Sequence, residues 1–427
     1  MFMTGFRCVA CSTEQTADFD GYVCPACGGN LDVTYNHDAI AATIDPDNPF
    51  RSDRDDIFKY APLLPLADPA SSAPGLRIGA TPLYHADRLG PSIGLQHVYI
   101  KDDGLNPSAS YKDRASAVAL ARAREIGAPI VAGASTGNAG SSMACLAANA
   151  AVPCVIFVPE KAPAAKIAQL LIFGAHVMAV RGTYDDAFDL CLEFCNKHGW
   201  FNRNTGYNPF TREGKKTCSF EICEALQWQA PDWVVVPVGD GNIISGIWKG
   251  FLDLYAIKLI DRLPRLVCAQ STESDAITRA IRTLRKQYGD TTDIDWRSVS
   301  IPTVQATTCA DSISVDMPRD GLAAVRAVIE SRGEAVTVPD LDILSAIGEL
   351  ALKQGIFAEP AAATAWACLK KLAAEHRIEP DQRVVCLITG SGLKDIAAAR
   401  KVAGEPTVIA PSLEAAEASL RPLLENR

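Results

Sequence analysis

The sequence has no uninterrupted apolar run long enough to cross a bilayer, no basic-then-apolar segment at its N-terminus, and no excess of positive charge. A membrane span needs about 20 apolar residues and a secretory signal needs the second pattern, so we expect neither. The net charge of −9 argues against a nucleic-acid or anionic-membrane partner, because such partners bind basic surfaces. Internal repeats and low-complexity tracts are absent too. These absences favour a globular protein of the cytoplasm that acts on a small molecule.

The composition is that of a protein with real hydrophobic cores. The chain has 427 residues, of which 48% are hydrophobic and 21% charged, which is enough material for two or three domains. It also has 14 cysteines. Without a secretory signal, so many cysteines favour the reducing cytoplasm over a disulfide scaffold.

Four cysteines have an explanation of their own. Two Cys-x2-Cys pairs are separated by twelve residues, the spacing of a four-thiolate metal ribbon, and the ligands would be Cys8, Cys11, Cys24 and Cys27. Thiolates alone favour zinc over hard cations, and a closed set of four leaves no open position for catalysis. We therefore predict a structural zinc module over residues 1–35. Four reduced cysteines with no metal are the alternative.

From about residue 78 onward, apolar strand candidates alternate with helical candidates. We expect strands at 98–101, 129–132, 154–158, 176–180, 233–238, 265–270 and 383–388. We expect helices at 113–126, 139–149, 164–173, 184–198, 214–226, 244–260, 341–354 and 360–375. Such alternation predicts an α/β protein with parallel sheets covered on both faces. Residues 411–427 are typical of an amphipathic helix packed on the surface.

One lysine lies in the junction between a predicted strand and the predicted helix that follows it. The loop of residues 106–111 contains Asn-Pro and two serines, and Lys112 follows it at the mouth of the helix. Lysine can form an imine with an aldehyde cofactor. Most lysines are solvated surface charges, so this position alone is weak evidence of catalysis.

Three glycine-containing turns follow other predicted strands, at 133–140, 238–246 and 389–395. A turn that opens a helix offers free N–H groups and a positive dipole end to an anion. Taken singly, each is equally well an ordinary capped strand–helix turn. Turns at the carboxyl ends of strands, together with an imine-forming lysine, suit a ligand with an aldehyde, a phosphate, a ring oxygen and a ring nitrogen. Pyridoxal 5′-phosphate is that ligand.

The order of these motifs resembles the threonine synthase family. The resemblance is carried by residues 79–83, 106–114, 135–138, the glycine loop, 359–361 and 389–395. This family has fold type II, the tryptophan-synthase-like fold of pyridoxal-phosphate enzymes. The resemblance implies two three-layer domains with parallel sheets beside the zinc-ribbon-like module. The large domain would comprise residues 36–110 and 200–410, the smaller one residues 111–199, and a homodimer is the default of the superfamily.

The resemblance also implies roles for individual residues. Lys112 would bind the cofactor covalently and act as the catalytic base. Asn138 would bond the cofactor's phenolic oxygen, Thr389 would face its pyridine nitrogen, and its phosphate would lie in the loop of Gly239, Asp240, Gly241, Asn242 and Ile243. The substrate would contact Ser110, Ser135, Thr136, Gly137 and Lys216. The implied reaction converts O-phospho-L-homoserine and water to L-threonine and phosphate.

The chain departs from the family pattern at the site expected for the substrate phosphate. Thr211 stands where many members carry an arginine, and Arg212 comes one position too late to point the same way. Ala109 stands where a glycine is usual. Lysines at 215, 216 and 249 could form a different phosphate site.

These departures keep two other functions open. One is a different elimination or β-replacement enzyme on the same scaffold, such as a threonine/serine dehydratase or a synthase that uses O-phosphoserine. The other is a non-catalytic protein that binds partners through the cysteine ribbon. Retention of Lys112, Asn138, the glycine loop and Thr389 argues against the second.

Overall fold

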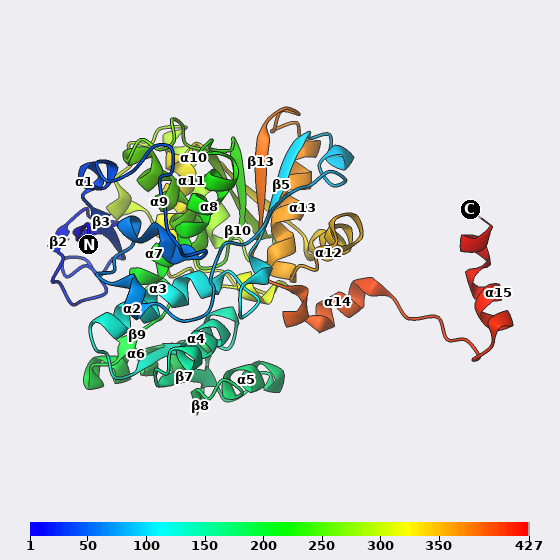
Figure 1. Ribbon diagram of the computed structural model, residues 1–427, viewed down its shortest axis with the longest axis horizontal. Coiled ribbons are helices and arrows are strands. Elements are labelled where there is room, and N and C mark those ends of the chain that lie inside the picture. Colours follow the sequence, from blue (N-terminus) through cyan, green and yellow to red (C-terminus); the bar gives the residue numbers. More distant parts are fainter. Residues whose placement is uncertain (426–427) are drawn as a thin grey trace.

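The computed structural model describes residues 1–425, whose strands form three separate sheets (Figure 1). The N-terminal sheet is antiparallel, in the order β2-β1-β3. It consists of β1 (Met3–Cys8), β2 (Glu14–Thr16) and β3 (Leu31–Tyr35). Phe6 of β1 packs edge-on against Phe210, with ring centroids 6.0 Å apart, so this sheet is docked on the main body.

The large sheet has six strands in the order β12-β11-β10-β13-β5-β4, and all neighbours are parallel except β4 and β5. Val234, Val235 and Val236 in β10 are fully buried, as expected for a central parallel strand covered on both faces. The strands are β4 (Leu83–His85), β5 (His97–Asp102), β10 (Trp233–Pro237), β11 (Arg265–Ser271), β12 (Glu334–Val338) and β13 (Arg383–Ile388).

Helices cover both faces of the large sheet, which makes three layers. On one face α13 (Pro360–Ala374) packs against the strands, with α12 (Asp340–Gln354) beside it. The other face is covered by α9 (Asn242–Ala256), α10 (Ala276–Tyr288) and α11 (Gly321–Glu330). Next to α9 lie α7 (Phe210–Lys215) and α8 (Thr217–Ala225), and α3 (Lys112–Glu125) packs on α7.

The small sheet is fully parallel, in the order β8-β7-β6-β9. Its strands are β6 (Val131–Ala134), β7 (Cys154–Pro159), β8 (His176–Val180) and β9 (Phe201–Asn202). Helices α4 (Asn138–Asn149) and α5 (Ala164–Leu171) pack on it, as does α6 (Tyr184–His198), whose buried residues form a separate core with β6 and β7. The pairing of β9 with β6 carries this sheet past residue 199.

The connections contain several short helices. Two brief α-helices are α1 (His37–Ala41) and α2 (Pro69–Ser72). The 3-10 helices are Ile57–Leu63, Pro91–Ile93, Asp103–Leu105, Trp296–Ser298, Asp311–Ile313 and Gly392–Lys394. Among residues 1–425, no helix is both long and apolar enough to span a membrane.

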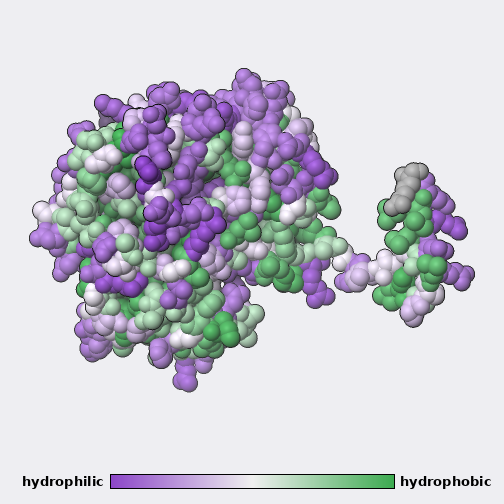
Figure 2. All heavy atoms as spheres, viewed as in Figure 1, coloured by the Kyte–Doolittle hydropathy of each residue, from purple (hydrophilic) through white to green (hydrophobic). Residues whose placement is uncertain are grey.

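The C-terminal segment extends away from the body (Figure 1). After α14 (Ile396–Ala403), an extended stretch leads to α15 (Leu413–Leu424), which contains no buried residue. Figure 2 shows hydrophobic residues gathered on this helix. Leu413, Leu420 and Leu423 are among its exposed side chains. The predicted helix is present, but the expectation that it packs on the surface is wrong in this structure. Residues 426 and 427 of the predicted range lie outside the described residues.

Candidate active site

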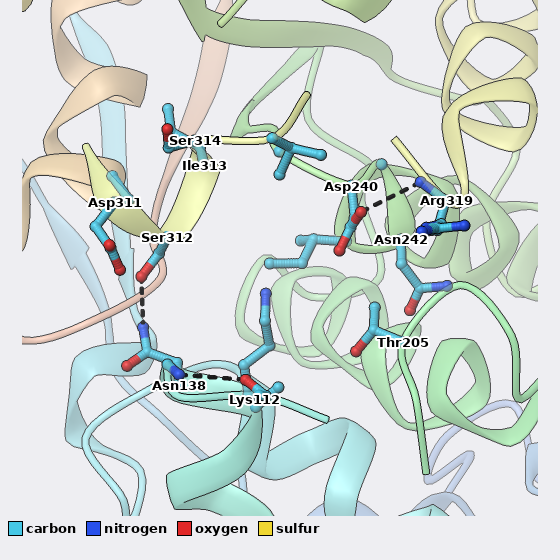
Figure 3. Close-up of a pocket in the computed structure, with 18 of the residues that line it drawn as sticks. Lys112, Asn138, Thr205, Asp240, Asn242, Asp311, Ser312, Ile313, Ser314 and Arg319 are labelled. Carbon is cyan, nitrogen blue, oxygen red and sulfur yellow. Dashed lines mark hydrogen bonds between the residues drawn. The ribbon is translucent and has the colours of Figure 1, made fainter. Parts of the chain in front are cut away.

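A cavity of about 650 Å³ opens at the carboxyl ends of the parallel strands (Figure 3). Its lining comes from the residues that follow β6, β10 and β13 and from the first residues of α3, α4 and α9. In open α/β folds this edge is where ligands bind.

Lys112 is the first residue of α3, and its side chain rises into this cavity (Figure 3). The helix start is fixed by Tyr111, whose backbone N–H donates to the carbonyl of Thr389 at 2.8 Å and whose hydroxyl donates to the carbonyl of Lys215 at 2.7 Å. Burial lowers the pKa of Lys112, while the charges of Asp240 and Glu359 oppose that shift. Among the described residues, its ammonium group has no hydrogen-bond partner, and Lys112 lines the cavity.

The turn between β10 and α9 has no room for side chains at two glycines. A Cβ on Gly239 would lie 2.8 Å from Cα of Ile313. A Cβ on Gly241, where φ is +93°, would lie 2.7 Å from the carbonyl oxygen of Asp320. The backbone therefore approaches the cavity closely, and α9 begins at Asn242 with its positive end there. Such a turn, with free N–H groups at the start of a helix, can hold a phosphate group.

Asn138 and Glu359 form a polar pair on the opposite wall of the cavity. The Asn138 amide donates to the two carboxylate oxygens of Glu359 at 3.0 and 3.1 Å, and to the hydroxyl of Ser312 at 3.2 Å. Figure 3 shows the contact with Ser312. Burial raises the pKa of Glu359. In the sequence Glu359 belongs to a motif but has no predicted role, because a lone glutamate carries no signal of which amide it will meet.

Most of the residues predicted from the sequence line this one cavity. The structure brings together Lys112, Ser135, Thr136, Gly137, Asn138, Gly239, Asp240, Gly241, Asn242, Ile243 and Thr389. The backbone N–H of Arg319 donates to Asp240 at 3.2 Å, and burial raises the pKa of Asp240. The turn of residues 135–137 lies at the N-terminus of α4, where free N–H groups favour a carboxylate.

Two predicted substrate residues lie elsewhere. Lys216 is fully buried, with its ammonium 2.5 Å from Glu213 and 2.6 Å from Asp253, so its charge is already neutralised and the prediction for it is wrong in this structure. Ser110 is buried in the loop before α3, where it forms a β-bridge to Gly390 and does not line the cavity.

The structure also shows which of the other cations near residue 211 reach the cavity. Lys249 donates to the carbonyl of Val33 at 2.9 Å, away from the cavity. Arg212 pairs with Asp32 and Asp320 and does not take the place of the family's arginine. Of the three lysines considered for a phosphate site, Lys215 alone lines the cavity.

The four cysteines of the ribbon converge. The sulfur atoms of Cys8, Cys11, Cys24 and Cys27 all lie within 4.8 Å of one another. Individual pairs are 3.4–3.6 Å apart. A tetrahedral zinc ion with Zn–S bonds of about 2.3 Å sets its sulfurs about 3.8 Å apart, so the cluster suits zinc closely.

Comparison with known proteins identifies relatives over nearly the whole chain. Residues 75–390 match the family described as pyridoxal-phosphate dependent enzyme. The threonine synthase of Methanocaldococcus jannaschii is 37% identical over 404 residues, which is 94% of this chain and 96% of the relative. The threonine synthase of Methanosarcina acetivorans is 35% identical, covering 97% of this chain and 98% of the relative.

Solved structures with the same fold are more distant in sequence. The processed form of threonine deaminase isoform 2 from Solanum lycopersicum aligns with a TM-score of 0.65 at 21% identity, covering 83% of this chain and 94% of that one. The serine racemase of maize aligns with a TM-score of 0.59 at 19% identity, covering 81% of this chain and 93% of that one. At such identities the likeness establishes only that this chain has the same fold as these two enzymes.

Proposed function

The chain belongs to the threonine synthase family of pyridoxal-phosphate dependent enzymes, and we infer that it converts O-phospho-L-homoserine and water to L-threonine and phosphate. The observation that carries this inference is the alignment with threonine synthases over 94% of the chain, joined to a cavity with the lysine and the glycine loop that the chemistry needs. The dehydratase alternative has less support, because the likeness to the tomato threonine deaminase is at 21% identity.

The residues of the cavity fit pyridoxal 5′-phosphate. Lys112 would bind its aldehyde, the loop from Gly239 to Ile243 would hold its phosphate, and Thr389 would face its pyridine nitrogen. Asn138 and Glu359, which are hydrogen-bonded to each other, would supply polar contacts to the cofactor. When bound, the cofactor supplies an electron sink for the carbanionic states of the substrate. A threonine hydroxyl does not keep the ring nitrogen protonated as a carboxylate would, which favours elimination and replacement chemistry.

Lys112 would move protons at Cα, Cβ and Cγ of the substrate while phosphate leaves. An amine can do this near neutral pH only if its pKa is below that of an ordinary lysine, and burial in the cavity supplies that shift. The substrate α-carboxylate would bind at the N-terminus of α4, to Ser135, Thr136 and Gly137. There the helix dipole and free N–H groups stabilise a negative charge.

The cysteine ribbon would hold one structural zinc ion. The short sulfur–sulfur separations support this, and four thiolates leave no position for a substrate. Hydrogen bonds from Arg326 to the carbonyl of Val9 at 2.6 Å and from Asn30 to Asp320 at 2.7 Å tie the module to the large domain.

The proposed domain division follows the three sheets except at β9, which lies beyond residue 199 but pairs with β6 of the small sheet. It consists of the ribbon over residues 1–35, a large domain of residues 36–110 and 200–410, a smaller domain of residues 111–199, and the C-terminal helix. A homodimer and a cytoplasmic location complete this proposal. The cytoplasmic location is supported by the 14 cysteines, none of which forms a disulfide within residues 1–425.

The test is phosphate release from O-phospho-L-homoserine by the cofactor-loaded protein, with the amino-acid product identified. We expect equal amounts of phosphate and threonine, both lost in Lys112→Ala and retained in Lys197→Ala, which changes an exposed lysine of α6. No release from this substrate, with cofactor absorbance that responds instead to serine, threonine or O-phosphoserine, would overturn the substrate assignment in favour of the dehydratase or O-phosphoserine alternative.

A further inference from the structure

The family's phosphate-binding arginine has no counterpart at position 211 of this chain. Thr211 is fully buried, and its hydroxyl donates to the carbonyl of Asn208 at 2.8 Å. It does not line the cavity. A phosphorylated substrate therefore needs its positive charge from another element.

Arg203 supplies a guanidinium at the cavity from the end of β9. Its backbone N–H donates to the carbonyl of Ala132 in β6, which fixes the residue at the carboxyl edge of the small sheet. The side chain is held by two hydroxyls: Nε donates to Ser116 at 3.1 Å and Nη1 donates to Thr205 at 2.7 Å. Figure 3 shows Thr205 beside Asn242, on the wall opposite Asn138. These hydroxyl groups fix the orientation of the Arg203 side chain but do not neutralise its positive charge.

The second terminal nitrogen of Arg203 has no partner among the described residues. Nη2 is buried and makes no hydrogen bond, and the residue as a whole is only 4% exposed. The carboxylate whose charge opposes the lowering of its pKa is Asp113, but the two oxygens of Asp113 accept hydrogen bonds from the backbone N–H and the hydroxyl of Ser108. Burial lowers the pKa of Arg203 to about 10. A buried guanidinium with a free donor and no ion-pair partner is an incomplete anion site.

Lys215 adds a second cation at the same place. It is fully buried at the end of α7, and its ammonium donates at 2.5 Å to the neutral side chain of Asn242. Its pKa is lowered, first by burial and then by the neighbouring charges of Lys112 and Arg203. Lys112, Arg203 and Lys215 line one cavity, and the charge of Arg203 lowers the pKa of both lysines, so an anion bound there would stabilise the charged forms of all three.

We propose that Arg203, with Lys215 beside it, binds the phosphate of the substrate in this chain, in place of the arginine missing at position 211. This inference rests on the proposed function, because it names the anion site of that same reaction. The cofactor phosphate has its own cradle at Gly239 and Gly241, and the substrate carboxylate has the turn at the start of α4. The phosphate of O-phospho-L-homoserine is the remaining anion, and a guanidinium with a free N–H donor suits it.

The experiment compares Arg203→Met with the wild-type holoenzyme. We expect KM for O-phospho-L-homoserine to rise about 10- to 100-fold, with a smaller change in kcat, since the lost contact is a charge-assisted hydrogen bond. Inorganic phosphate should raise the melting temperature of the wild-type holoenzyme and not that of the variant. Cofactor affinity should be unchanged. Arg181→Met, which alters an exposed arginine of the small domain, is the matched control and should behave as wild type.

Two further readouts separate phosphate binding from other roles. L-homoserine, which lacks the phosphate, should perturb the cofactor absorbance of wild type and Arg203→Met with equal affinity. If its binding falls as much as that of the phosphorylated substrate, Arg203 binds the carboxylate and the proposal is overturned. Lower cofactor affinity in the variant would likewise assign Arg203 to the cofactor phosphate.

A second variant keeps the proposal testable if Arg203→Met does not fold. Arg203→Lys keeps a positive charge at the same place but lacks the guanidinium fork, so it should raise KM less than Arg203→Met does, by about tenfold or less. A folded, cofactor-loaded Arg203→Lys or Arg203→Met variant with wild-type KM would overturn the proposal. If the wild-type protein binds inorganic phosphate through Arg203 but releases none from O-phospho-L-homoserine, the anion site stands and the proposed function fails.

Discussion

Ala109 has a left-handed backbone, with φ of +60°, in the loop that positions Lys112. Its N–H donates to Asn106 at 2.7 Å and its carbonyl accepts from Ser391 at 3.1 Å, so the loop cannot relax without breaking these contacts. Only glycine adopts this conformation without a steric cost of about 1–2 kcal/mol. This explains why a glycine is usual here in the family.

Ala109→Gly should therefore stabilise the protein. Part of the gain is offset by the greater unfolded-state entropy of glycine, so we expect a net gain of about 1 kcal/mol or less. With an unfolding entropy of about 2.1 cal/mol/K per residue, the melting temperature would rise by roughly 1 °C. Differential scanning calorimetry measures this. Ala42→Gly, at a position with φ of −67°, is the control and should lower it; a fall for Ala109→Gly would refute the strain argument.

Asp102, at the end of β5, carries a charge that costs stability. Burial, with a smaller contribution from Asp103, raises its pKa to about 6, and Lys101 only partly opposes this. The folded state therefore holds a proton that the unfolded state has released between about pH 4 and pH 6, so the charge penalty develops as pH rises through this interval.

Asp102→Asn should remove that penalty and keep the hydrogen bond that Gly104 donates to this side chain at 3.0 Å. We expect the variant to be more stable than wild type by about 1–3 kcal/mol at pH 8, with the difference vanishing near pH 4. Melting temperatures at several pH values test this, with the exposed Asp290→Asn as the control. An advantage that is independent of pH would show that the charge of Asp102 is not the cause.

At the scale of elements, the sequence was most informative where apolar runs are long and bounded by glycine turns. Helix α6 (Tyr184–His198) and strand β13 (Arg383–Ile388) have the predicted bounds. Strand β12 (Glu334–Val338) was missed, because its half-buried, charged start breaks the apolar run. Helix α10 (Ala276–Tyr288) was missed because Arg, Lys and Thr residues surround a narrow apolar stripe. The predicted helix 214–226 is two helices that meet at Lys216.

The residues of the candidate site also fall into those that the sequence could predict and those that it could not. Lys112 and the glycine loop have local sequence signals, since a strand–turn–helix junction places them at the sheet edge whatever the rest of the chain does. Arg203 and Glu359 have no such signal. Arg203 reaches the cavity through the pairing of the two-residue strand β9 with β6, and Glu359 through contact with Asn138, which is 221 positions away in sequence. Long-range contacts of this kind cannot be read from spacing.

The turn between β10 and α9 gives a prediction about cofactor binding. Gly241→Ala would force a Cβ against the Asp320 carbonyl and displace the start of α9 from the cavity. We expect affinity for pyridoxal 5′-phosphate to fall at least about tenfold, because the backbone N–H groups of this turn would bind its phosphate and would be displaced. Fluorescence titration measures it. Gly174→Ala, also at positive φ but with open space around it, is the control. Equal affinity of the two variants for pyridoxal 5′-phosphate would contradict a phosphate site at this turn.

The cysteine ribbon gives a prediction about metal content. The purified protein should contain one zinc ion per chain by elemental analysis, and Cys11→Ser should lose it. Because the ribbon packs through Phe6 on α7, metal loss should lower the melting temperature by several degrees while the cofactor absorbance remains. Cys309→Ser, outside the cluster, should retain the metal. Full stability with no zinc in the wild-type protein would show that the thiols pack without an ion.

At the scale of the whole molecule, the ordered body ends near α14, and the C-terminal helix is separate from it. None of the residues from 404 to 425 is buried, so they contribute little to the free energy of folding of the body. An isolated 12-residue helix is marginal in water, and its exposed leucines form an apolar face that favours association. We therefore expect stability and activity to depend on residues 1–403, and any role of α15 to lie in contacts with other molecules.

Removal of residues 405–427 tests this division of roles. We expect the truncated protein to keep its melting temperature within about 1 °C, because unfolding exposes almost the same area with or without the tail. Turnover of O-phospho-L-homoserine should also be unchanged, since the cavity lining ends at Thr389. Sedimentation should report the same oligomeric state if the proposed dimer forms through the body. A truncated protein that dissociates into monomers would instead place α15 in the dimer contact, and loss of turnover with it would show that assembly completes the active site.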